Sequence, residues 1–363
     1  TGQINVLVGT NTGSGLTEGL ENVAMGHNSL LVDTKGQRST ALGYGTLAAQ
    51  NFTSLTEVYN TAVGFNAGAA VTTGIYNTTV GGLAGDALTD ADYNIAIGGL
   101  ALSSDTKGSN SVAVGYRALT TQNNSSATQA NNTAIGTNAG ASVTDGINNV
   151  FVGHGAGAGH QSGDHSIYIG RDAGYHATPT TTGSYNIFIG SFTDGDANDT
   201  GAMIVMGYNV TSVGNQNFTF GNNTTDSNIA FGATSISAPS DERLKEDIKD
   251  ETVGLAFINE LRPVTFQWKK ANDIPTDMKA YDKDSDERVM NGKYNHGFIA
   301  QEVKAVIDKY DIKDGCNLWS ESGEDKRQRL AEGELVPFLV KALQELSAQV
   351  TTLQAEVKAL KGE

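Results

Sequence analysis

The sequence predicts a mainly β N-terminal part, built as a parallel β-solenoid from a 17-residue repeat, followed by an α+β domain that ends in a long coiled-coil helix. Three observations support this fold class. A five-residue unit recurs fourteen times before residue 233. Charged residues rise from 20 of the first 239 positions to 44 of the last 124, so the composition changes abruptly at Ser240. A heptad pattern of Leu and Val runs to the C-terminus.

The repeat unit reads Asn, aliphatic, small or aromatic, aliphatic, Gly, as in Asn60–Gly64. The closing glycines are mostly 17 residues apart, and a short fixed period is typical of a solenoid in which each repeat forms one coil. The two aliphatic residues of a unit point to one face of a strand. Asn begins ten of the fourteen units, so stacking predicts a hydrogen-bonded ladder of amides.

The middle residue of the unit changes size along the repeat. It is Ala in most early units and becomes Phe151, Tyr168 and Phe188 later. The space that this residue faces is therefore expected to be cramped early and roomier after about residue 150. Either an axis shared by several chains or a single-chain roll that widens would explain the change.

Three coils are longer than 17 residues, which places extra residues in the segments 44–59, 116–131 and 171–185. Insertions in a solenoid project from one face and often form its binding surface. Aromatic residues lie there among Asn, Gln, Thr and Ser, a mixture that suits sugar binding and also describes any exposed loop. The candidates for receptor contact are Tyr44, Phe52, Tyr59, Tyr116, Tyr175 and Tyr185.

After Ser240 the pattern is mixed. It predicts helices over residues 251–261 and 298–310, a strand over 264–268 and a long helix from residue 332. The end of this helix, about 335–361, carries apolar residues at alternating spacings of four and three, which predicts an oligomeric coiled coil with a weak preference for two strands. These residues are Leu339, Leu343, Leu346, Val350, Leu353, Val357 and Leu360.

Composition excludes several classes of function. The net charge is −16 and no basic stripe exists, so we expect no nucleic-acid partner. No apolar run is long enough for membrane insertion. The histidines at 154, 160, 165 and 176 contain no His-x-His pair, and the acidic residues before Ser240 are scattered. We therefore expect no metal site, no cofactor and no glycosidase site.

Ser240 and Lys245 lie five residues apart at the change in composition. A serine nucleophile with a lysine base can cleave an amide without a histidine or a metal. Such a lysine must be neutral, which requires burial or a nearby cation. Alternatively, Ser240 caps a helix whose first turn holds Asp241 and Glu242, and Lys245 lies in solvent.

The N-terminal units resemble the head repeats of trimeric bacterial adhesins, and similar repeats occur in phage tail fibres. The resemblance rests on Asn60–Gly64 followed by Ala67, and on Ser111–Gly115 followed by Ala118. It implies three chains, each forming its own parallel β-roll or joining a shared triple β-helix. The period here is longer than that of the usual adhesin repeat.

Four blocks after residue 239 resemble, in order, the C-terminal intramolecular chaperone auto-processing domain of phage tailspikes, tail fibres and endosialidases. They are SDERLK at 240–245 followed by Ile248, the stretch 255–268, HGFIAQEV at 296–303 and ELVPFLVKALQEL at 334–346. The resemblance implies a homotrimer whose chaperone domains hold the C-termini together while the β-structure entwines. It also implies a serine endopeptidase that acts once, in cis.

By this resemblance, cleavage falls between Pro239 and Ser240, with Ser240 as the nucleophile and Lys245 as the general base. His296 and Glu302 lie in a matching block, where they would support the catalytic residues or the assembly; alternatively, they belong to an ordinary polar cluster at the start of a helix. The expected organisation is a repetitive receptor-binding region over 1–232, a linker over 233–239 and the chaperone domain over 240–363.

The resulting interpretation is the tip of a phage tail fibre or tailspike that recognises the host surface. Its expected partners are two further copies, a host polysaccharide or outer-membrane component, and other tail proteins that bind through an N-terminal part preceding Thr1. We expect folding and processing in the host cytoplasm, release of the chaperone fragment, and a mature fibre in the virion tail. The alternatives are a trimeric cell-surface adhesin and a polysaccharide-degrading tailspike.

Overall fold

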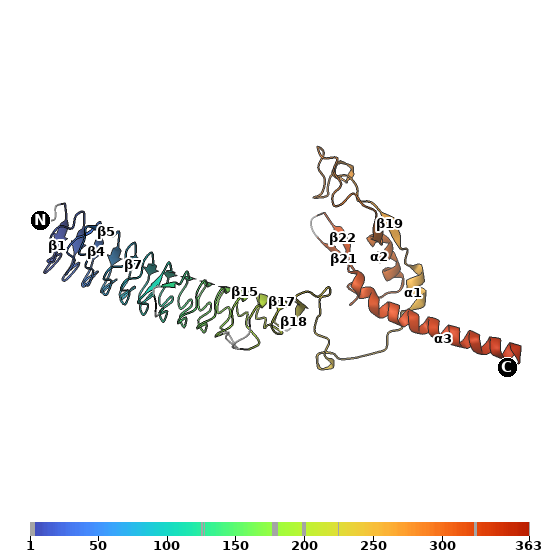
Figure 1. Ribbon diagram of the computed structural model, residues 1–363. Coiled ribbons are helices and arrows are strands. Elements are labelled where there is room, and N and C mark those ends of the chain that lie inside the picture. The colour runs from blue at the N-terminus through green and yellow to red at the C-terminus, as the bar shows by residue number, and fades with distance from the viewer. Residues whose placement is uncertain are drawn as a thin grey trace. The chain divides into compact units, whose positions relative to one another are not determined.

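The computed structural model describes residues 4–124, 126, 128–175, 181–197, 201–223, 225–322 and 325–362. The chain divides into two compact units, residues 1–241 and 242–363. The first is a stack of similar coils, and the second is a small α+β fold with one long helix (Figure 1). The predicted β-solenoid, followed by a small α+β region and a long C-terminal helix, is therefore confirmed, while the coiled coil and the homotrimer stay predictions.

One 14-stranded sheet runs the length of the first unit, because each coil contributes one strand that pairs with the strands of the coils before and after it. All neighbours are parallel up to β17, and Ala24 of β2 lies opposite Ala41 of β4. The strands are β1 (Val6–Val8), β2 (Val23–Met25), β4 (Thr40–Leu42), β6 (Thr61–Val63), β7 (Thr78–Val80), β8 (Ile95–Ile97), β10 (Val112–Val114), β12 (Thr133–Ile135), β13 (Val150–Val152), β14 (Ile167–Ile169), β15 (Ile187–Ile189), β16 (Ile204–Tyr208), β17 (Asn217–Asn222) and β18 (Thr225–Ala230).

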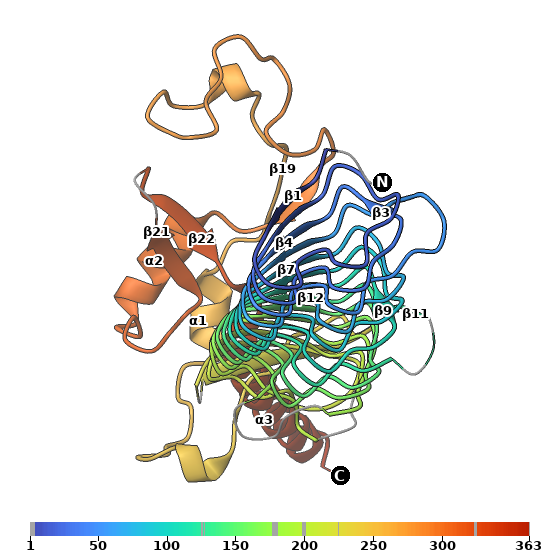
Figure 2. The same ribbon diagram turned by 90° about the vertical axis from the view of Figure 1, so that its left-hand side faces the viewer.

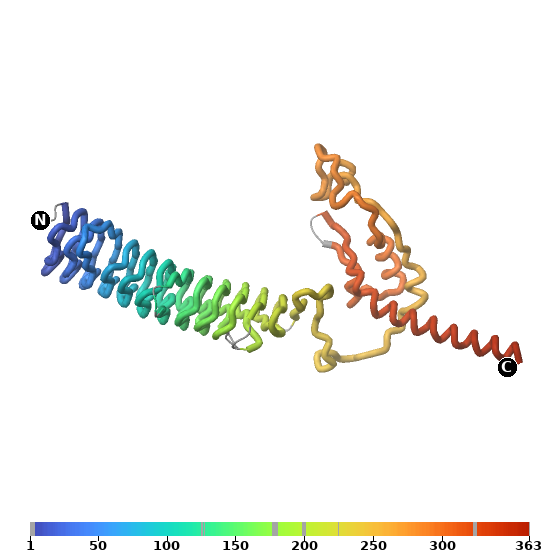
Figure 3. The backbone as a smooth tube through the Cα atoms, in the orientation of Figure 1, coloured from blue at the N-terminus to red at the C-terminus, as the bar shows by residue number. Residues whose placement is uncertain are grey.

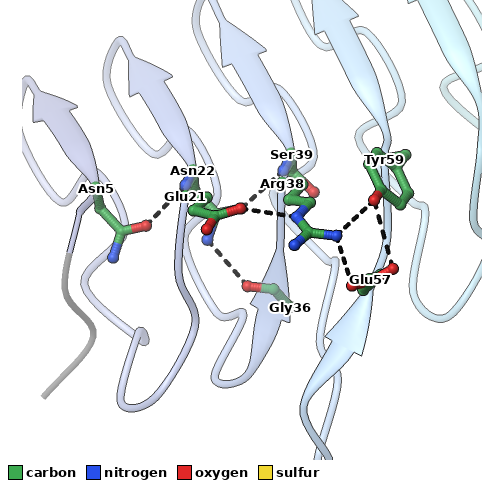
Figure 4. Close-up of polar contacts among 8 residues, drawn as sticks. All are labelled: Asn5, Glu21, Asn22, Gly36, Arg38, Ser39, Glu57 and Tyr59. Carbon is green, nitrogen blue, oxygen red and sulfur yellow. Dashed lines mark hydrogen bonds and ion pairs between the residues drawn. The ribbon is translucent and has the colours of Figure 1, made fainter.

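The expected asparagine ladder is present, but its rungs join each amide to the backbone of the next coil rather than to the next amide. Asn5 Oδ1 accepts the N–H of Asn22 at 2.8 Å, and Asn22 Oδ1 accepts the N–H of Ser39 at 2.8 Å (Figure 4). Asn22 Nδ2 donates to the carbonyl of Gly36 at 2.9 Å. Each amide therefore satisfies one buried donor and one buried acceptor that would otherwise be orphaned.

Two of the longer coils use their extra residues to repair this ladder where Ser replaces Asn. Gln50 Nε2 donates to Ser39 Oγ at 3.0 Å and to Asp33 Oδ2 at 2.7 Å, and Gln50 Oε1 accepts from Asn60 Nδ2 at 2.9 Å. Gln122 makes the equivalent contacts 72 residues later, with Asp105, Ser111 and Asn132. Short parallel strand pairs border these coils: β3 (Gly36–Gln37) with β5 (Thr56–Glu57), and β9 (Gly108–Ser109) with β11 (Thr128–Gln129).

From β2 to β15, the middle residue of each three-residue strand of this sheet points into the interior of its own coil, where it is buried, whereas Leu7 of β1 is 40% exposed. Ala113 is followed six residues later by a buried Leu119, whereas Phe151 is followed by Gly157. A Cβ on Gly157 would overlap the Phe151 ring. In these coils bulk is exchanged between two positions inside one chain, and the middle residue faces its own coil rather than an axis shared by several chains. Further examples are Ala24 with Leu30, Ala41 with Leu47, Ala96 with Leu102 and, in the opposite sense, Tyr168 with Gly174. Ala62 with Gly68 and Ala134 with Gly140 are small at both positions, so the exchange does not hold at every coil.

Each coil closes within one chain, as the view along the stack shows (Figure 2). The glycine that ends each unit turns the chain there, with φ near +135° at Gly64 and Gly136. A Cβ on Gly136 would lie 2.4 Å from the carbonyl oxygen of Gly153 in the next coil. Only glycine fits both the backbone angle and this close approach.

The first and third residues of each strand point outward and form an aliphatic row that we call the outer sheet face. It extends along the coil stack, and many of its side chains are exposed within one chain. The exposed members are Val6, Val8, Val23, Met25, Ile95, Ile97, Ile135, Ile169 and Met206.

The last repeat unit is not a solenoid coil. β18 runs antiparallel to β17, with Asn217 opposite Ala230. The expectation of fourteen equivalent coils is wrong here, because the final spacing of 11 residues is too short to complete a coil and forms a hairpin instead.

The second unit contains α1 (Leu255–Glu260), β19 (Val264–Phe266), β20 (Asn295–Gly297), α2 (Ala300–Lys309), β21 (Trp319–Ser322), β22 (Arg327–Leu330) and α3 (Val336–Lys361), with short 3₁₀ turns η1 (Glu242–Leu244), η2 (Ala271–Asp273) and η3 (Glu332–Leu335). Its strands pair antiparallel, β19 with β20 and β21 with β22. The backbone trace makes the long helix plain (Figure 3). A core of Phe257, Val303, Ile307, Leu318 and Phe338 joins its three helices.

The predicted elements of the second unit are present but shorter than expected. The first helix begins at Leu255 rather than at residue 251, because the Glu251 carboxylate accepts the N–H of Val253 at 2.7 Å in a local turn. Glu345 of α3 then accepts the N–H of Leu255 at 2.8 Å. The strand ends at Phe266 rather than 268, the middle helix spans 300–309, and the long helix starts as a 3₁₀ turn.

Candidate self-cleavage and assembly sites

The predicted cleavage point lies two residues beyond a bridge that ties the chain back to β18. Ser237 forms a bridge with Asn228 of β18, and Ser237 Oγ lies 2.9 Å from Asn228 Oδ1. Pro239 and Ser240 follow, both exposed. The bond between them is thus held by an anchored residue on one side and is open to solvent.

Lys245 follows the η1 turn and is exposed, with its N–H bonded to the Glu242 carbonyl at 3.0 Å. Two apolar residues beside it, Leu244 and Ile248, are also exposed. A lysine base needs burial or a nearby cation to become neutral. Lys245 is exposed in this structure, so the burial that a neutral lysine requires is not seen here.

The structure separates the two other candidates of the second unit. His296 is exposed in β20, opposite Thr265 of β19, and lines a cavity of about 960 Å³ together with Trp268. Glu302 does not line this cavity. It lies in the first turn of α2 and pairs with Arg262, whose Nε is 2.9 Å from Glu302 Oε2.

The Arg262 guanidinium holds the pKa of Glu302 below its usual range through this hydrogen-bonded pair. A similar contact joins Glu260 of α1 to Lys309 and Tyr310 of α2, which lowers the pKa of the Glu260 carboxyl. Both pairs link α1, or the loop after it, to α2. Glu302 is therefore suited to positioning these helices, a role that sequence reasoning left open.

Sequence reasoning missed the contact of Glu345 with the start of α1. Glu345 lies in the block that resembles the chaperone domain, and a Cβ on Gly254 would come within 2.7 Å of its carboxylate. The signal that could have found it is the Gly before the apolar run of α1, which leaves the helix without a side-chain cap of its own.

The seven heptad residues of α3 are all exposed within one chain, from 45% to 88%. The helix buries its other side, with Phe338 and Ala342 against the core of the unit. An apolar seam of this length in water is the pattern of a coiled coil that awaits partner helices.

Five of the six receptor candidates are exposed: Tyr44, Tyr59, Tyr116, Tyr175 and Tyr185. Phe52 is only 7% exposed, so its assignment to the receptor surface is wrong. Its N–H donates to the buried carboxylate of Asp33, which draws this part of the inserted segment inward. Four of the exposed tyrosines directly precede or follow a repeat unit, namely Tyr44, Tyr59, Tyr116 and Tyr185.

Within the described ranges, no group of three or more His, Cys, Asp and Glu residues could hold a metal ion. His160 is buried against Tyr168, and His176 lies outside the described residues. No helix among the described residues is long and apolar enough to cross a membrane.

Comparison with known proteins agrees with a change of structure near Ser240. Residues 240–312 match the Peptidase_S74 family, described as chaperone of endosialidase, and the match begins at Ser240. No curated protein and no solved structure matches the chain. The family implies a self-cleaving peptidase. A chaperone-of-endosialidase domain that follows an N-terminal β-solenoid is the composition of a phage tail fibre or tailspike with a C-terminal chaperone, and residues 240–312 of this chain are similar to that domain.

Proposed function

We propose that three copies of this chain assemble a host-recognising tail fibre tip and then cut themselves between Pro239 and Ser240. The observation that carries the proposal is that the family match begins at Ser240, directly after the solenoid ends. The chaperone domain would then hold the chains together while the solenoids associate. Cleavage would detach it once.

The chemistry follows from the order of the residues. Ser240 Oγ attacks the carbonyl carbon of Pro239, and Lys245 takes the hydroxyl proton. The Pro239–Ser240 C–N bond breaks as the nitrogen accepts that proton, leaving an ester on Ser240 Oγ and a free amine. Water hydrolyses the ester, which yields the Pro239 carboxylate and restores the hydroxyl.

Two exposed apolar surfaces support a homotrimer: the heptad seam of α3 and the outer sheet face. Parallel β-structure with distant contacts folds slowly and exposes strand edges on the way. Joining the chains at α3 raises their local concentration where register must be set. Release of the chaperone then leaves a fibre whose stability is kinetic.

Exposure of Lys245 within one chain suggests that cleavage waits for assembly. In this proposal, packing of the other copies buries Lys245 and makes it a base. Cleavage would then report correct assembly. A chain with Leu353→Asp and Val357→Asp, which disrupts the seam, should remain monomeric and uncut. A monomeric seam variant that still cuts would refute this link.

Host contact is assigned to the solenoid surface, where exposed tyrosines lie among polar residues. Tyr175 lies in the third inserted segment, residues 171–185, and is exposed. Replacing it by Ala should weaken binding to host cells while leaving the assembly and its cleavage intact.

Self-cleavage is tested by expressing the full chain and separating the products on a denaturing gel. Wild type should give a fragment ending at Pro239 by mass spectrometry, whereas Ser240→Ala and Lys245→Ala should each leave one band. Ser235→Ala and Lys249→Ala are matched controls on the same exposed segment and should cut normally. An intact wild-type chain in a folded trimer would overturn the site assignment.

A further inference from the structure

Two rows of side chains border the outer sheet face, one at each end of its strands. The start row consists of the residue just before each repeat unit, and the end row consists of the residue just after the closing glycine. Within one coil these positions are six residues apart, as Tyr76 and Gly82 are. The start row reads Glu21, Arg38, Tyr59, Tyr76, Tyr93, Asn110, Asn131, Asn148, His165, Tyr185 and Ala202, and the end row His27, Tyr44, Phe65, Gly82, Gly99, Tyr116, Thr137, His154, Arg171, Ser191 and Tyr208.

Each row is ordered along its own length. In the start row the rings of Tyr59, Tyr76 and Tyr93 stack at centroid spacings of 5.0 and 5.2 Å. Arg38 closes this stack by donating to the Tyr59 hydroxyl and pairing with Glu21 (Figure 4). All three tyrosines are nevertheless exposed toward solvent.

The end row has its own ring stack, which stops at two glycines. His27, Tyr44 and Phe65 stack at 5.2 and 5.3 Å, and Gly82 and Gly99 follow before Tyr116. A Cβ on Gly82 would meet nothing within 4 Å, whereas one on Gly99 would meet the Tyr116 ring of the same chain at 3.5 Å. Neither glycine has a φ in the left-handed region, so backbone geometry does not require glycine at these two positions.

The sizes of the two rows are reciprocal at several coils. The glycines at 82 and 99 share their coils with Tyr76 and Tyr93. Near the C-terminal end of the solenoid, the large Tyr185 of the start row shares its coil with the small Ser191 of the end row. In the next coil the small residue, Ala202, is in the start row and the large one, Tyr208, is in the end row. At one coil, Tyr59 with Phe65, both residues are aromatic.

This reciprocity has no explanation inside one chain. Six residues of strand span up to about 20 Å, too far for the two side chains of one coil to meet. Among the described residues, no ring contact or hydrogen bond joins the start row to the end row. Compensation in size between positions that do not touch points to contact between copies.

We infer that the start row of one copy packs against the end row of the next, coil by coil, with Tyr76 filling the space above Gly82 and Tyr93 lying at the level of Gly99. The inference rests on the homo-oligomer proposed above. In a cyclic arrangement of parallel copies with their outer sheet faces inward, the strand starts of one copy meet the strand ends of its neighbour at the same level. Both rows are then covered at every corner.

The remaining coils fit the same pairing chemically. Glu21 would meet the partner's His27, a carboxylate against an imidazole. Arg38 would meet the partner's Tyr44, a guanidinium over a ring. A shift by one coil in one direction would set Tyr93 against the partner's Tyr116 and Tyr185 against its Tyr208. A shift in the other direction would set Tyr59 against the partner's Tyr44 and Tyr76 against its Phe65. The pairing therefore specifies the axial register of the copies, which an aliphatic sheet face alone cannot do.

The first test moves one ring between the rows of the full-length chain. Gly82→Tyr should fold within one chain but crowd the neighbour's Tyr76, lowering the unfolding temperature of the oligomer. Adding Tyr76→Gly should restore it, because the ring then sits on the opposite row at the same level; a left-handed φ of 57° at Tyr76 accepts Gly readily. The control Tyr76→Gly with Gly99→Tyr is one coil out of step and should show no rescue. Additive effects in both doubles would overturn the inference.

The second test measures proximity between copies directly. With Cys316→Ser as background, the pair Tyr76→Cys and Gly82→Cys should give covalent oligomers with a short bismaleimide, whereas Tyr76→Cys with Tyr116→Cys should give none. Equal cross-linking by both pairs, or none by the matched pair in a native oligomer, overturns the inference. A wild-type chain that is monomeric by native mass spectrometry would overturn the proposed assembly itself.

Discussion

The buried glutamine of the first long coil provides the sharpest stability prediction. Gln50→Met keeps an unbranched side chain of similar length but removes every hydrogen-bonding atom. It leaves Asp33 Oδ2 and Ser39 Oγ without the donor at 2.7 and 3.0 Å, while Asn60 Nδ2 keeps its bond to the Gly74 carbonyl. These groups are at most 1% exposed, so water does not replace the lost partner.

The expected loss is worked from two orphaned polar groups. Each costs about 1–3 kcal/mol when it is buried and unsatisfied, so the local stability should fall by about 2–6 kcal/mol. Because every 1.4 kcal/mol is tenfold in an equilibrium, amide exchange through local opening should accelerate by about 30-fold or more. Hydrogen exchange with mass spectrometry on the full chain measures this for peptides within 33–64.

The chain contains its own replicate and control. Gln122→Met should accelerate exchange within 105–136 and leave 33–64 unchanged, because its network is separate. Gln161→Met removes an exposed glutamine and should change exchange by less than a few-fold. If exchange within 33–64 responds to Gln50→Met no more than to Gln161→Met, the polar network contributes nothing and the reasoning fails.

Three further predictions follow from contacts of the two units. Phe151→Ala should cost the solenoid about 3–5 kcal/mol in chemical denaturation, because it removes a fully buried ring that packs on Gly157 and Tyr168; a loss below 1 kcal/mol would contradict the packing. Gly254→Ala should destabilise the second unit, and more so than Glu345→Gln, because the new Cβ collides with that carboxylate; helix content by circular dichroism reports it. Glu302→Gln should make the free energy of unfolding depend less on pH under acidic conditions. Arg262 lowers the pKa of Glu302, so the ion pair stabilises the fold above the ordinary carboxyl pKa. This stabilisation is lost as the pH falls through the pKa of Glu302 in the folded protein. An unchanged acid midpoint would argue against that pair.

The amino-acid sequence determined the solenoid, its coil length, the heptad seam and the change of structure near Ser240. Each of these depends on local periodicity: a strand places alternate residues on one face, and a helix places every third or fourth residue on one side. The Asn at the head of each unit likewise predicted a ladder, since stacked copies of a residue must meet.

Only the tertiary structure decided where the bulk and the polar groups of each coil go. The residue six positions after the middle one is Leu119 for Ala113 and Gly157 for Phe151, and the two positions meet only after the chain has turned through the coil. Phe52 lies in an inserted segment yet is buried, because the carboxylate of Asp33 in the preceding coil binds its backbone. The start of α1 depends on Glu345, 90 residues away. Local patterns show which way a side chain points along its own element, but not which distant group it meets.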